Sequence, residues 1–472
     1  MANKLTYQID FSHPAHIYFI GIGGVSMSGL AHILHDKGFT VSGSDRRASS
    51  MTDDLSARGI RIFIGENAEN ILNPKTPIDA VIYTAAVHPD NPEYAACVAK
   101  GLPLLSRAQL LGQMMRFYKT SVAVAGTHGK TSTTSMISEI LMTADADPTL
   151  LIGGIYPGIG SNIRIGQSDT LVTEACEYTN SFLDFYPTIG LILNVEADHL
   201  DFFKDLDDIF HSFHRFAKLL PKNGSLIIGG DIQRLNELVS DLTCPYYTFG
   251  LSDSYDYYAN DIVYDEEGLP SFLIHVNKTG TSFPLKLSVP GAHNVKNAVA
   301  AFACADLMGI DADKILLGLS RFVGASRRFE VKGNWRGVTI VDDYAHHPTE
   351  ISVTLSAAKR VPHKTLWCVF QPHTYTRTKA LLREFAIALS KADHVVLLPI
   401  YAAREDDIYG ISSADLRDRI LSLGADCTLT DNFENVKSFL SENCTKGDLL
   451  ITMGAGDVTI IGTELLDSDF ST

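Results

Sequence analysis

Short apolar runs alternate with amphipathic segments from one end of the chain to the other. In the first third, predicted strands lie at residues 16–22, 40–44, 61–65, 80–86 and 102–105, and predicted helices at 30–37, 92–100 and 108–118. Strands that alternate with helices predict a parallel sheet covered by helices on both faces. The first third therefore predicts a Rossmann-like domain.

The same alternation continues through the rest of the chain. Further predicted strands lie at residues 121–125, 169–173, 188–195, 338–341, 366–370, 394–400 and 448–453. Further predicted helices lie at residues 132–142, 298–308, 349–359, 413–422 and 432–442. Residues 324–330 combine a glycine, small residues and two cations, which is typical of a hinge between domains.

One loop between a predicted strand and a predicted helix has the composition of a phosphate site. It consists of Gly126, Thr127, His128, Gly129, Lys130, Thr131 and Ser132. Free backbone N–H groups and the helix dipole favour an anion there, Lys130 reaches outer phosphates, and the Thr131 hydroxyl suits Mg²⁺. A glycine-rich turn without a ligand is the alternative, because valine stands at position 124, where the full P-loop pattern has glycine. We interpret the loop as a site for a nucleoside triphosphate.

Two more predicted strands end in residues that suit a metal-nucleotide site. Glu174 and His199 follow them, and parallel neighbouring strands would bring both to the phosphate loop. Thr131, Glu174 and His199 are then candidate Mg²⁺ ligands, with Lys130, Glu174 and His199 as catalytic candidates. A capping or solvated Glu174 and a structural His199 are the alternatives, since Mg²⁺ prefers oxygen ligands.

The first predicted strand runs into a glycine-rich turn with Gly23, Gly24 and Ser26, and the second ends at Asp45. This pattern suits a ligand that carries a nucleotide, and NAD is one alternative, although serine occupies the third glycine position. Arg107 follows the last strand of this domain, where it either faces the ligand crevice or lies solvated on the surface.

Polar clusters also follow predicted strands in the last third, and two amides lie on one helical face before it. The amides are Asn294 and Asn297, which either cap a helix or bind an adenine edge. The later clusters contain Arg328, Asp343, His347, His373 and Arg377.

Composition narrows the class of protein. The 472 residues are 45% hydrophobic and 20% charged, as in globular domains, with a net charge of −16. Such a charge argues against nucleic-acid and membrane-surface partners, which need a basic footprint. Seven scattered cysteines, no C-x-x-C pair, no secretory segment and no apolar run of about 20 residues favour a cytoplasmic protein.

With these motifs in place, the chain resembles the Mur ligase family of peptidoglycan precursor enzymes along nearly its full length. The resemblance rests on residues 21–30, 126–131, 194–199, 291–297, 327–330, 342–350 and 371–378, in this order and spacing. Departures from the family pattern include Cys176, where many members have aspartate, and Thr374, where many have arginine.

The resemblance implies three α/β domains: a Rossmann-like UDP-sugar domain at residues 1–117, a central P-loop ATPase-like domain with a parallel sheet at 118–324, and a Rossmann-like amino-acid domain at 325–472. It implies that ATP, with Mg²⁺, drives amide formation between UDP-N-acetylmuramate and L-alanine. Carried over, Asn294 and Asn297 face the adenine, and Arg328 and Asp343 lie near the ribose. His347, His373 and Arg377 surround the amino acid. A sister ligase, an NAD-linked oxidoreductase and a nucleotide-switched regulator are the competing hypotheses.

Overall fold

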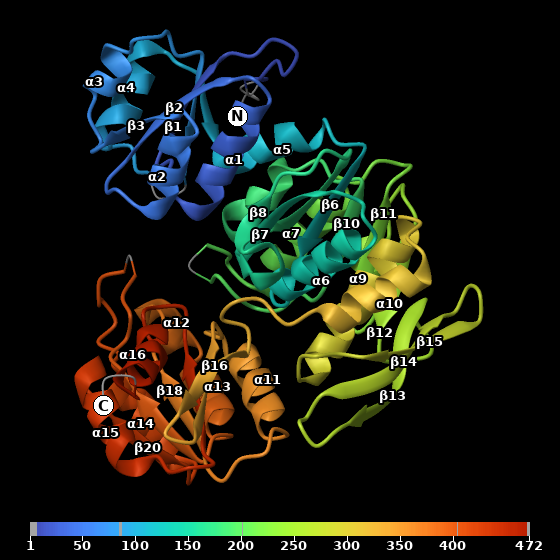
Figure 1. Cartoon of the computed structure of the whole chain (residues 1–472), viewed down its shortest axis with the longest axis vertical. Helices are drawn as coiled ribbons and strands as arrows, with labels where there is room; N and C mark the ends of the chain where they lie inside the picture. Colours follow the sequence, from blue (N-terminus) through green and yellow to red (C-terminus); the bar gives the residue numbers. More distant parts are fainter. Residues whose placement is uncertain (1–6, 85–86, 201, 404, 470–472) are drawn as a thin grey trace.

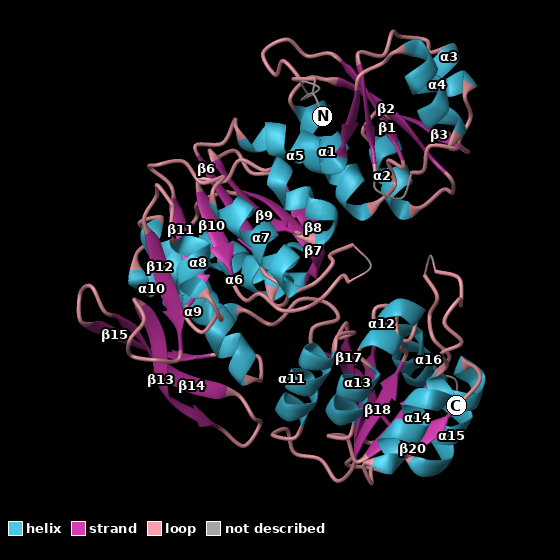
Figure 2. Cartoon of the chain, turned by 180° about the vertical axis from the view of Figure 1, so that it is seen from behind, coloured by secondary structure: helices cyan, strands magenta, loops and turns pink. Residues whose placement is uncertain are grey.

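The computed structural model describes residues 7–84, 87–200, 202–403 and 405–469. Three α/β bodies follow one another along the chain, each built on its own sheet (Figure 1). The middle body lies between the other two, and its sheet extends at one end into a projecting hairpin region (Figure 2). The predicted three-domain α/β architecture is therefore confirmed.

The N-terminal sheet is parallel throughout, in the order β3-β2-β1-β4-β5 that is typical of a Rossmann domain. Its strands are β1 (His16–Ile20), β2 (Thr40–Asp45), β3 (Arg61–Ile64), β4 (Ala80–Tyr83) and β5 (Leu104–Ser106). Its helices are α1 (Val25–Asp36), α2 (Ser50–Ala57), α3 (Glu69–Leu72), α4 (Pro92–Lys100) and α5 (Arg107–Met115). Ala85 and Ala86, the end of one predicted strand, lie outside the described residues.

The middle sheet has the order β15-β14-β13-β12-β11-β10-β6-β9-β7-β8. Its strands are β6 (Thr120–Ala125), β7 (Thr149–Tyr156), β8 (Ser161–Arg164), β9 (Thr170–Ala175), β10 (Ile189–Ile192), β11 (Ser225–Gly229), β12 (Tyr246–Gly250), β13 (Tyr257–Tyr264), β14 (Pro270–Val276) and β15 (Thr281–Lys286). Its helices are α6 (Lys130–Thr143), η1 (Pro157–Ile159), η2 (Tyr178–Asp184), α7 (Leu206–Ala217), α8 (Leu235–Val239), α9 (Ala292–Leu307) and α10 (Ala312–Arg321).

The expectation of a purely parallel central sheet needs correction. Strands β13, β14 and β15 pair antiparallel, as do β7 and β8, so hairpins extend a parallel centre at both edges. The parallel centre is β12-β11-β10-β6-β9-β7, and its three middle strands β10, β6 and β9 are the ones that the αβ alternation predicted.

The C-terminal sheet has the order β16-β17-β21-β18-β19-β20 and is also mixed, because β16 pairs antiparallel with β17. Its strands are β16 (Glu330–Trp335), β17 (Val338–Asp343), β18 (Leu366–Phe370), β19 (His394–Leu397), β20 (Asp426–Leu429) and β21 (Leu449–Met453). Its helices are α11 (Pro348–Ala358), α12 (Tyr375–Ala380), α13 (Leu382–Leu389), α14 (Ser413–Ser422), α15 (Phe433–Asn443) and α16 (Thr459–Asp469).

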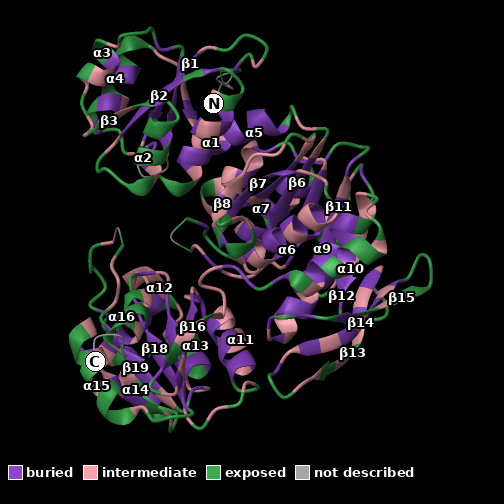
Figure 3. Ribbon diagram, viewed as in Figure 1, coloured by how far each residue is buried: buried purple, intermediate pink, exposed green. Residues whose placement is uncertain are grey.

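Burial follows the sheets: the central strands of each body are buried, and exposed residues gather on outer helices and loops (Figure 3). β1, β18 and β21 are buried at every position, as expected for strands covered on both faces. Within the described part of the chain, no helix has both the length and the apolar character needed to cross a membrane.

The first two bodies meet at two glycines. A Cβ added to Gly29 of α1 would lie 1.6 Å from Ile163 Cδ1 on β8, and one added to Gly112 of α5 would lie 1.9 Å from the Asp184 carbonyl oxygen. A side chain at position 112 would collide with backbone, whereas one at position 29 would collide with the end of the Ile163 side chain. The backbone of both helices therefore lies directly against the middle body.

Candidate active site

The candidate site lies where three neighbouring strands end. β6 pairs in parallel with β9 on one side and with β10 on the other, so Ala125, Ala175 and Ile192 lie in one row. The segments that follow these strands therefore converge at one edge of the sheet, where ligands bind in open α/β sheets. This confirms the predicted neighbourhood of the three strands.

The phosphate loop turns through Gly129, whose φ of 83° is left-handed, and α6 begins at Lys130. The Lys130 ammonium donates to the carbonyl oxygens of Gly126 and Thr127 at 2.5 and 3.1 Å, and to the Glu177 carboxylate at 3.0 Å. Burial opposes the charged form of Lys130, but the Glu177 carboxylate outweighs it and raises the lysine pKa. Lys130 is therefore charged and folded back across its own loop.

Glu174 and Thr131 lie beside this loop. The Glu174 carboxylate accepts a hydrogen bond from the Gly153 backbone N–H at 2.6 Å, and Glu174 lies close enough to Lys130 to favour its charge. Thr131 is buried in the first turn of α6, and its methyl group would lie 3.6 Å from a Cβ added to Gly154. Both residues thus flank β7, at one side of the loop.

His199 lies at the other side, nearer Glu177 than Glu174. Its Nε2 is 3.9 Å from the Glu177 carboxylate and 3.8 Å from that of Asp198, and its ring lies against Tyr178 with centroids 4.6 Å apart. The backbone φ of His199 is 53°, uncommon for a residue with a side chain. Asp198 accepts a hydrogen bond from the His199 N–H at 2.7 Å, which supports this conformation.

Glu177 contacts the Lys130 ammonium, Glu174 favours its charge, and the His199 ring lies near Glu177. Carboxylate oxygens and one imidazole are therefore available beside the phosphate loop, and Mg²⁺ is held mainly by such oxygen ligands. Glu177 belongs to this set, although the sequence analysis did not single it out. It is 2% exposed and faces both Lys130 and His199. Its place three residues after Glu174, beyond the same strand, was the available signal.

The two predicted amides lie together at the start of α9. The Asn297 side-chain amide donates to the Asn294 side-chain oxygen at 3.3 Å, and the Asn294 amide donates to the Pro290 backbone carbonyl at 2.8 Å. A Cβ added to Gly129 would lie 2.9 Å from the Asn297 side-chain oxygen. The amide pair therefore adjoins the phosphate loop directly.

Arg328 and Asp343 lie close to each other in the C-terminal body. Asp343 accepts hydrogen bonds from the backbone N–H groups of Phe329 and Ala345, at 2.8 and 2.7 Å. Burial raises the pKa of Asp343 to about 6, while the Arg328 guanidinium works in the opposite direction. Arg328 also lies over the Tyr344 ring, 5.2 Å from its centroid.

In the N-terminal body, the predicted glycine turn is held by its own acid. The Gly23 N–H donates to Asp45 at 2.9 Å, and Gly24 caps α1. Arg107 donates to the Ser26 hydroxyl at 2.9 Å, and burial lowers its pKa. Arg107 is therefore no solvated surface arginine: it contacts the turn, and Cys176 and Glu174 of the middle body favour its charge.

Residues of the C-terminal body contact the middle body beside the site. Arg377 donates to Asp198 at 3.0 Å and lies 3.4 Å from the His373 ring nitrogen. The His347 ring lies 3.2 Å from the Ala197 carbonyl oxygen. Arg377 and His347 thus contact the loop that carries His199, and His373 lies beside Arg377.

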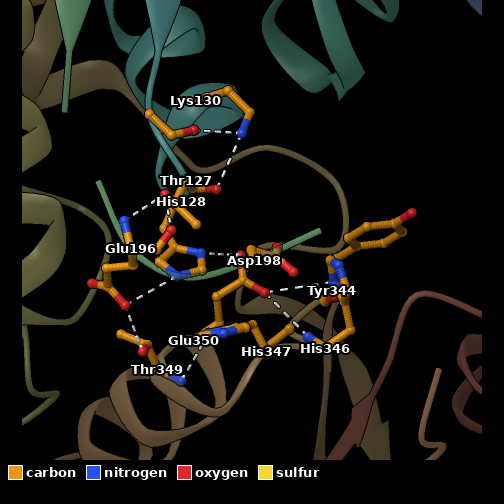
Figure 4. Close-up of polar contacts among 12 residues, drawn as sticks. Thr127, His128, Lys130, Glu196, Asp198, Tyr344, His346, His347, Thr349 and Glu350 are labelled. Carbon is orange, nitrogen blue, oxygen red and sulfur yellow. Dashed lines mark hydrogen bonds and ion pairs between the residues drawn. The ribbon is translucent and has the colours of Figure 1, made fainter. Parts of the chain in front are cut away.

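His128, at the tip of the phosphate loop, also meets the C-terminal body (Figure 4). Its Nδ1 lies 3.2 Å from Glu350 and its Nε2 3.5 Å from Glu196, which also accepts a hydrogen bond from the Thr349 hydroxyl at 2.7 Å. Burial opposes a charged His128, but the two carboxylates outweigh it and raise the pKa to about 9. An ionised chain of contacts therefore joins the loop to α11.

Comparisons with known proteins cover each of the three bodies. Residues 16–119 match the model described as Mur ligase family, catalytic domain, residues 124–305 match the Mur ligase middle domain, and residues 327–456 match the Mur ligase, glutamate ligase domain. A UDP-N-acetylmuramate–L-alanine ligase of Agathobacter rectalis is 55% identical over 460 residues, 98% of this chain and 99% of the relative. One of Lachnospira eligens is 55% identical over 98% of this chain and its full length.

Solved structures of ligases share the fold of this chain. A UDP-N-acetylmuramate-alanine ligase from Thermotoga maritima superposes with a TM-score of 0.79 at 28% identity, over 97% of this chain and 99% of the other. A murein peptide ligase from Psychrobacter arcticus superposes with a TM-score of 0.70 at 25% identity, over 96% and 98%.

Proposed function

The chain belongs to the Mur ligase family, and we infer from this that it is an ATP-dependent ligase that joins L-alanine to the lactyl carboxylate of UDP-N-acetylmuramate in peptidoglycan precursor synthesis. The observation that carries the inference is 55% identity to UDP-N-acetylmuramate–L-alanine ligases over nearly the whole length of both chains. The resemblance seen in the motifs is confirmed by that identity.

A second candidate is ligation of a peptide, because a murein peptide ligase shares the fold at a TM-score of 0.70. Its identity to this chain is 25%, against 55% for the alanine ligases. The higher identity favours L-alanine as the amine substrate.

We propose that ATP binds across the loop at residues 126–132. The β and γ phosphates lie on its N–H groups and Lys130, which first releases Glu177. Asn294 and Asn297 face the adenine, and their contact with Gly129 supports this role. Arg328 and Asp343 lie near the ribose.

Thr131, Glu174 and His199 would hold Mg²⁺. When bound, the ion neutralises charge on the phosphoryl oxygens. Glu177 is placed to help orient His199, since the two lie 3.9 Å apart.

The order of chemical steps follows from the substrates. A carboxylate is a poor acyl donor, so its oxygen first attacks the γ-phosphate, which gives an acyl phosphate and ADP. Lys130 stabilises the charge that develops on the transferred group. The amine of alanine then attacks the acyl carbon, and phosphate leaves. The C-terminal domain excludes water, which would otherwise hydrolyse the acyl phosphate.

We propose that Gly23, Gly24, Ser26, Asp45 and Arg107 bind the UDP-sugar, and that His347, His373 and Arg377 surround alanine. The contact of Arg107 with Ser26, on the side that faces Glu174, supports the first assignment. The three sheets support a division into domains at residues 1–117, 118–324 and 325–472.

Coupled ADP release, with substrates omitted one at a time, tests this function. We expect release only when ATP, UDP-N-acetylmuramate and L-alanine are all present. Release with a peptide but not with alanine would favour the second candidate, and release without either small substrate would refute a ligase.

A further inference from the structure

Three side chains from two bodies converge on one point beside the phosphate loop, and none of them is a proposed Mg²⁺ ligand. His128 comes from the phosphate loop, Glu196 follows β10, and His347 caps α11. Each offers one nitrogen or oxygen atom, and these atoms all lie within 4.8 Å of one another. The set shares no residue with Thr131, Glu174 and His199.

The closest pair already has the spacing of metal ligands. His128 Nε2 and Glu196 Oε2 are 3.5 Å apart. Two ligands of a tetrahedral Zn²⁺, each about 2.0–2.2 Å from the metal, are separated by about 3.3 Å. The other two edges of the triangle are at most 4.8 Å long, so they need an approach of no more than about 1.5 Å to reach that geometry.

His128 is oriented as metal-binding histidines are. Its Nε2 is buried and has no hydrogen-bond partner in the described part of the chain. Its Nδ1 faces the Glu350 carboxylate at 3.2 Å. A carboxylate on the second ring nitrogen fixes the ring and makes the first nitrogen a better ligand. The unpartnered Nε2 therefore points at the centre of the triangle.

The remaining features also suit a metal. The Glu196 side chain is 39% exposed, which leaves an entry path and room for a water ligand. His347 makes two long hydrogen bonds, from the Thr349 N–H at 3.3 Å and to the Ala197 carbonyl at 3.2 Å. The two contacts use different ring nitrogens, so coordination through one nitrogen would replace one of them and leave the other.

We propose that His128, Glu196 and His347 form a binding site for a transition-metal ion of the Zn²⁺ class, which joins the phosphate loop to the C-terminal body. Two imidazoles and one carboxylate select such an ion over Mg²⁺, which prefers oxygen ligands and octahedral geometry. The ion would not replace the Mg²⁺ of the ligase reaction, and its binding needs neither nucleotide nor alanine. His128 and His347 nevertheless also belong to the proposed ATP loop and alanine site, so the inference rests on the proposed function.

Cobalt(II) replaces Zn²⁺ in such sites and reports its coordination by visible absorbance. The protein is titrated with Co²⁺ at about pH 8, where the metal must displace the proton of His128, whose pKa is raised to about 9. A millimolar excess of Mg²⁺ is present, and nucleotide is omitted. We expect one strong Co²⁺ site with the intense bands of four- or five-coordinate geometry. Glu196→Gln, which keeps an acceptor for Thr349, should weaken it at least about tenfold.

His199→Asn is the matched control, because it removes the histidine of the proposed Mg²⁺ site and leaves the triangle intact. Loss of the Co²⁺ bands in His199→Asn, or unchanged affinity in Glu196→Gln, would overturn the proposal. Zn²⁺ should also raise the melting temperature of the wild type and not that of Glu196→Gln. If Glu196→Gln does not fold, the Co²⁺ titration and the melting temperature with Zn²⁺ are measured on His128→Gln instead. Unaltered Co²⁺ binding in His128→Gln would refute the site.

Discussion

Replacement of Gly129 by alanine tests the fit between the phosphate loop and the amide pair. A left-handed backbone costs alanine about 1–2 kcal/mol. The new methyl group would also lie 2.9 Å from the Asn297 oxygen and 3.3 Å from Leu193 Cδ1. Asn297 is 7% exposed and bonded to Asn294, so it cannot move aside freely. Overpacking of this kind adds about 1–3 kcal/mol.

Gly59→Ala is the control for the backbone cost. Its φ is 90°, close to the 83° of Gly129, and an added Cβ meets nothing within 4 Å. We expect Gly59→Ala to lose about 1–2 kcal/mol and to bind ADP normally. Gly129→Ala should lose about 1–3 kcal/mol more and bind ADP at least about tenfold more weakly. Denaturant unfolding and calorimetric titration measure both. Equal stability losses with unchanged ADP affinity would refute this account of the loop.

Three further outcomes are expected. Lys130→Ala should lower turnover by several orders of magnitude in a phosphate-release assay while the circular dichroism spectrum is unchanged; turnover at the wild-type level would remove the lysine from the phosphate site. Arg377→Ala should mainly raise the KM for alanine in the same assay, and an unchanged KM would assign that role to another residue. The pKa of His128 is raised from 6.5 to about 9, so its ion pairs hold the middle and C-terminal domains together fully below about pH 6.5 and are lost as the pH rises through about 9. With a chelator present, small-angle scattering should show expansion over that range in the wild type but not in His128→Gln.

Local pattern was enough to predict about half of the α-helices and most of the parallel strands. α14, for example, spans Ser413–Ser422 as the pattern predicts, because a helix depends on spacing within a few residues. The antiparallel extension β13-β14-β15 was not predicted. The position of this extension depends on the pairing of β13 with β12, which no local pattern specifies. The alternating burial of β14 is consistent with a strand but does not indicate its partner.

The predicted residues of the site were found at the strand ends, but their partners were not foreseen. Glu177 meets Lys130 across 47 residues of chain, and Glu350 meets His128 across 222. Such pairs depend on how sheets and domains are placed, which a single sequence does not specify. Sequence motifs indicate which side chains could act in the site. The protonation states of those side chains depend on neighbours that the fold brings close.

The close contacts at Gly29 and Gly112 limit how the enzyme can move. At Gly112 the backbone of α5 meets the backbone of the middle body, so no rotamer change can absorb a change of angle there, and at Gly29 only the Ile163 side chain can adjust. The first two domains are therefore expected to travel as one unit, which keeps the acid and the nucleotide at a constant separation before the amine arrives. Opening and closing then fall to the third domain alone, whose attachment is made of ion pairs that solvent can replace.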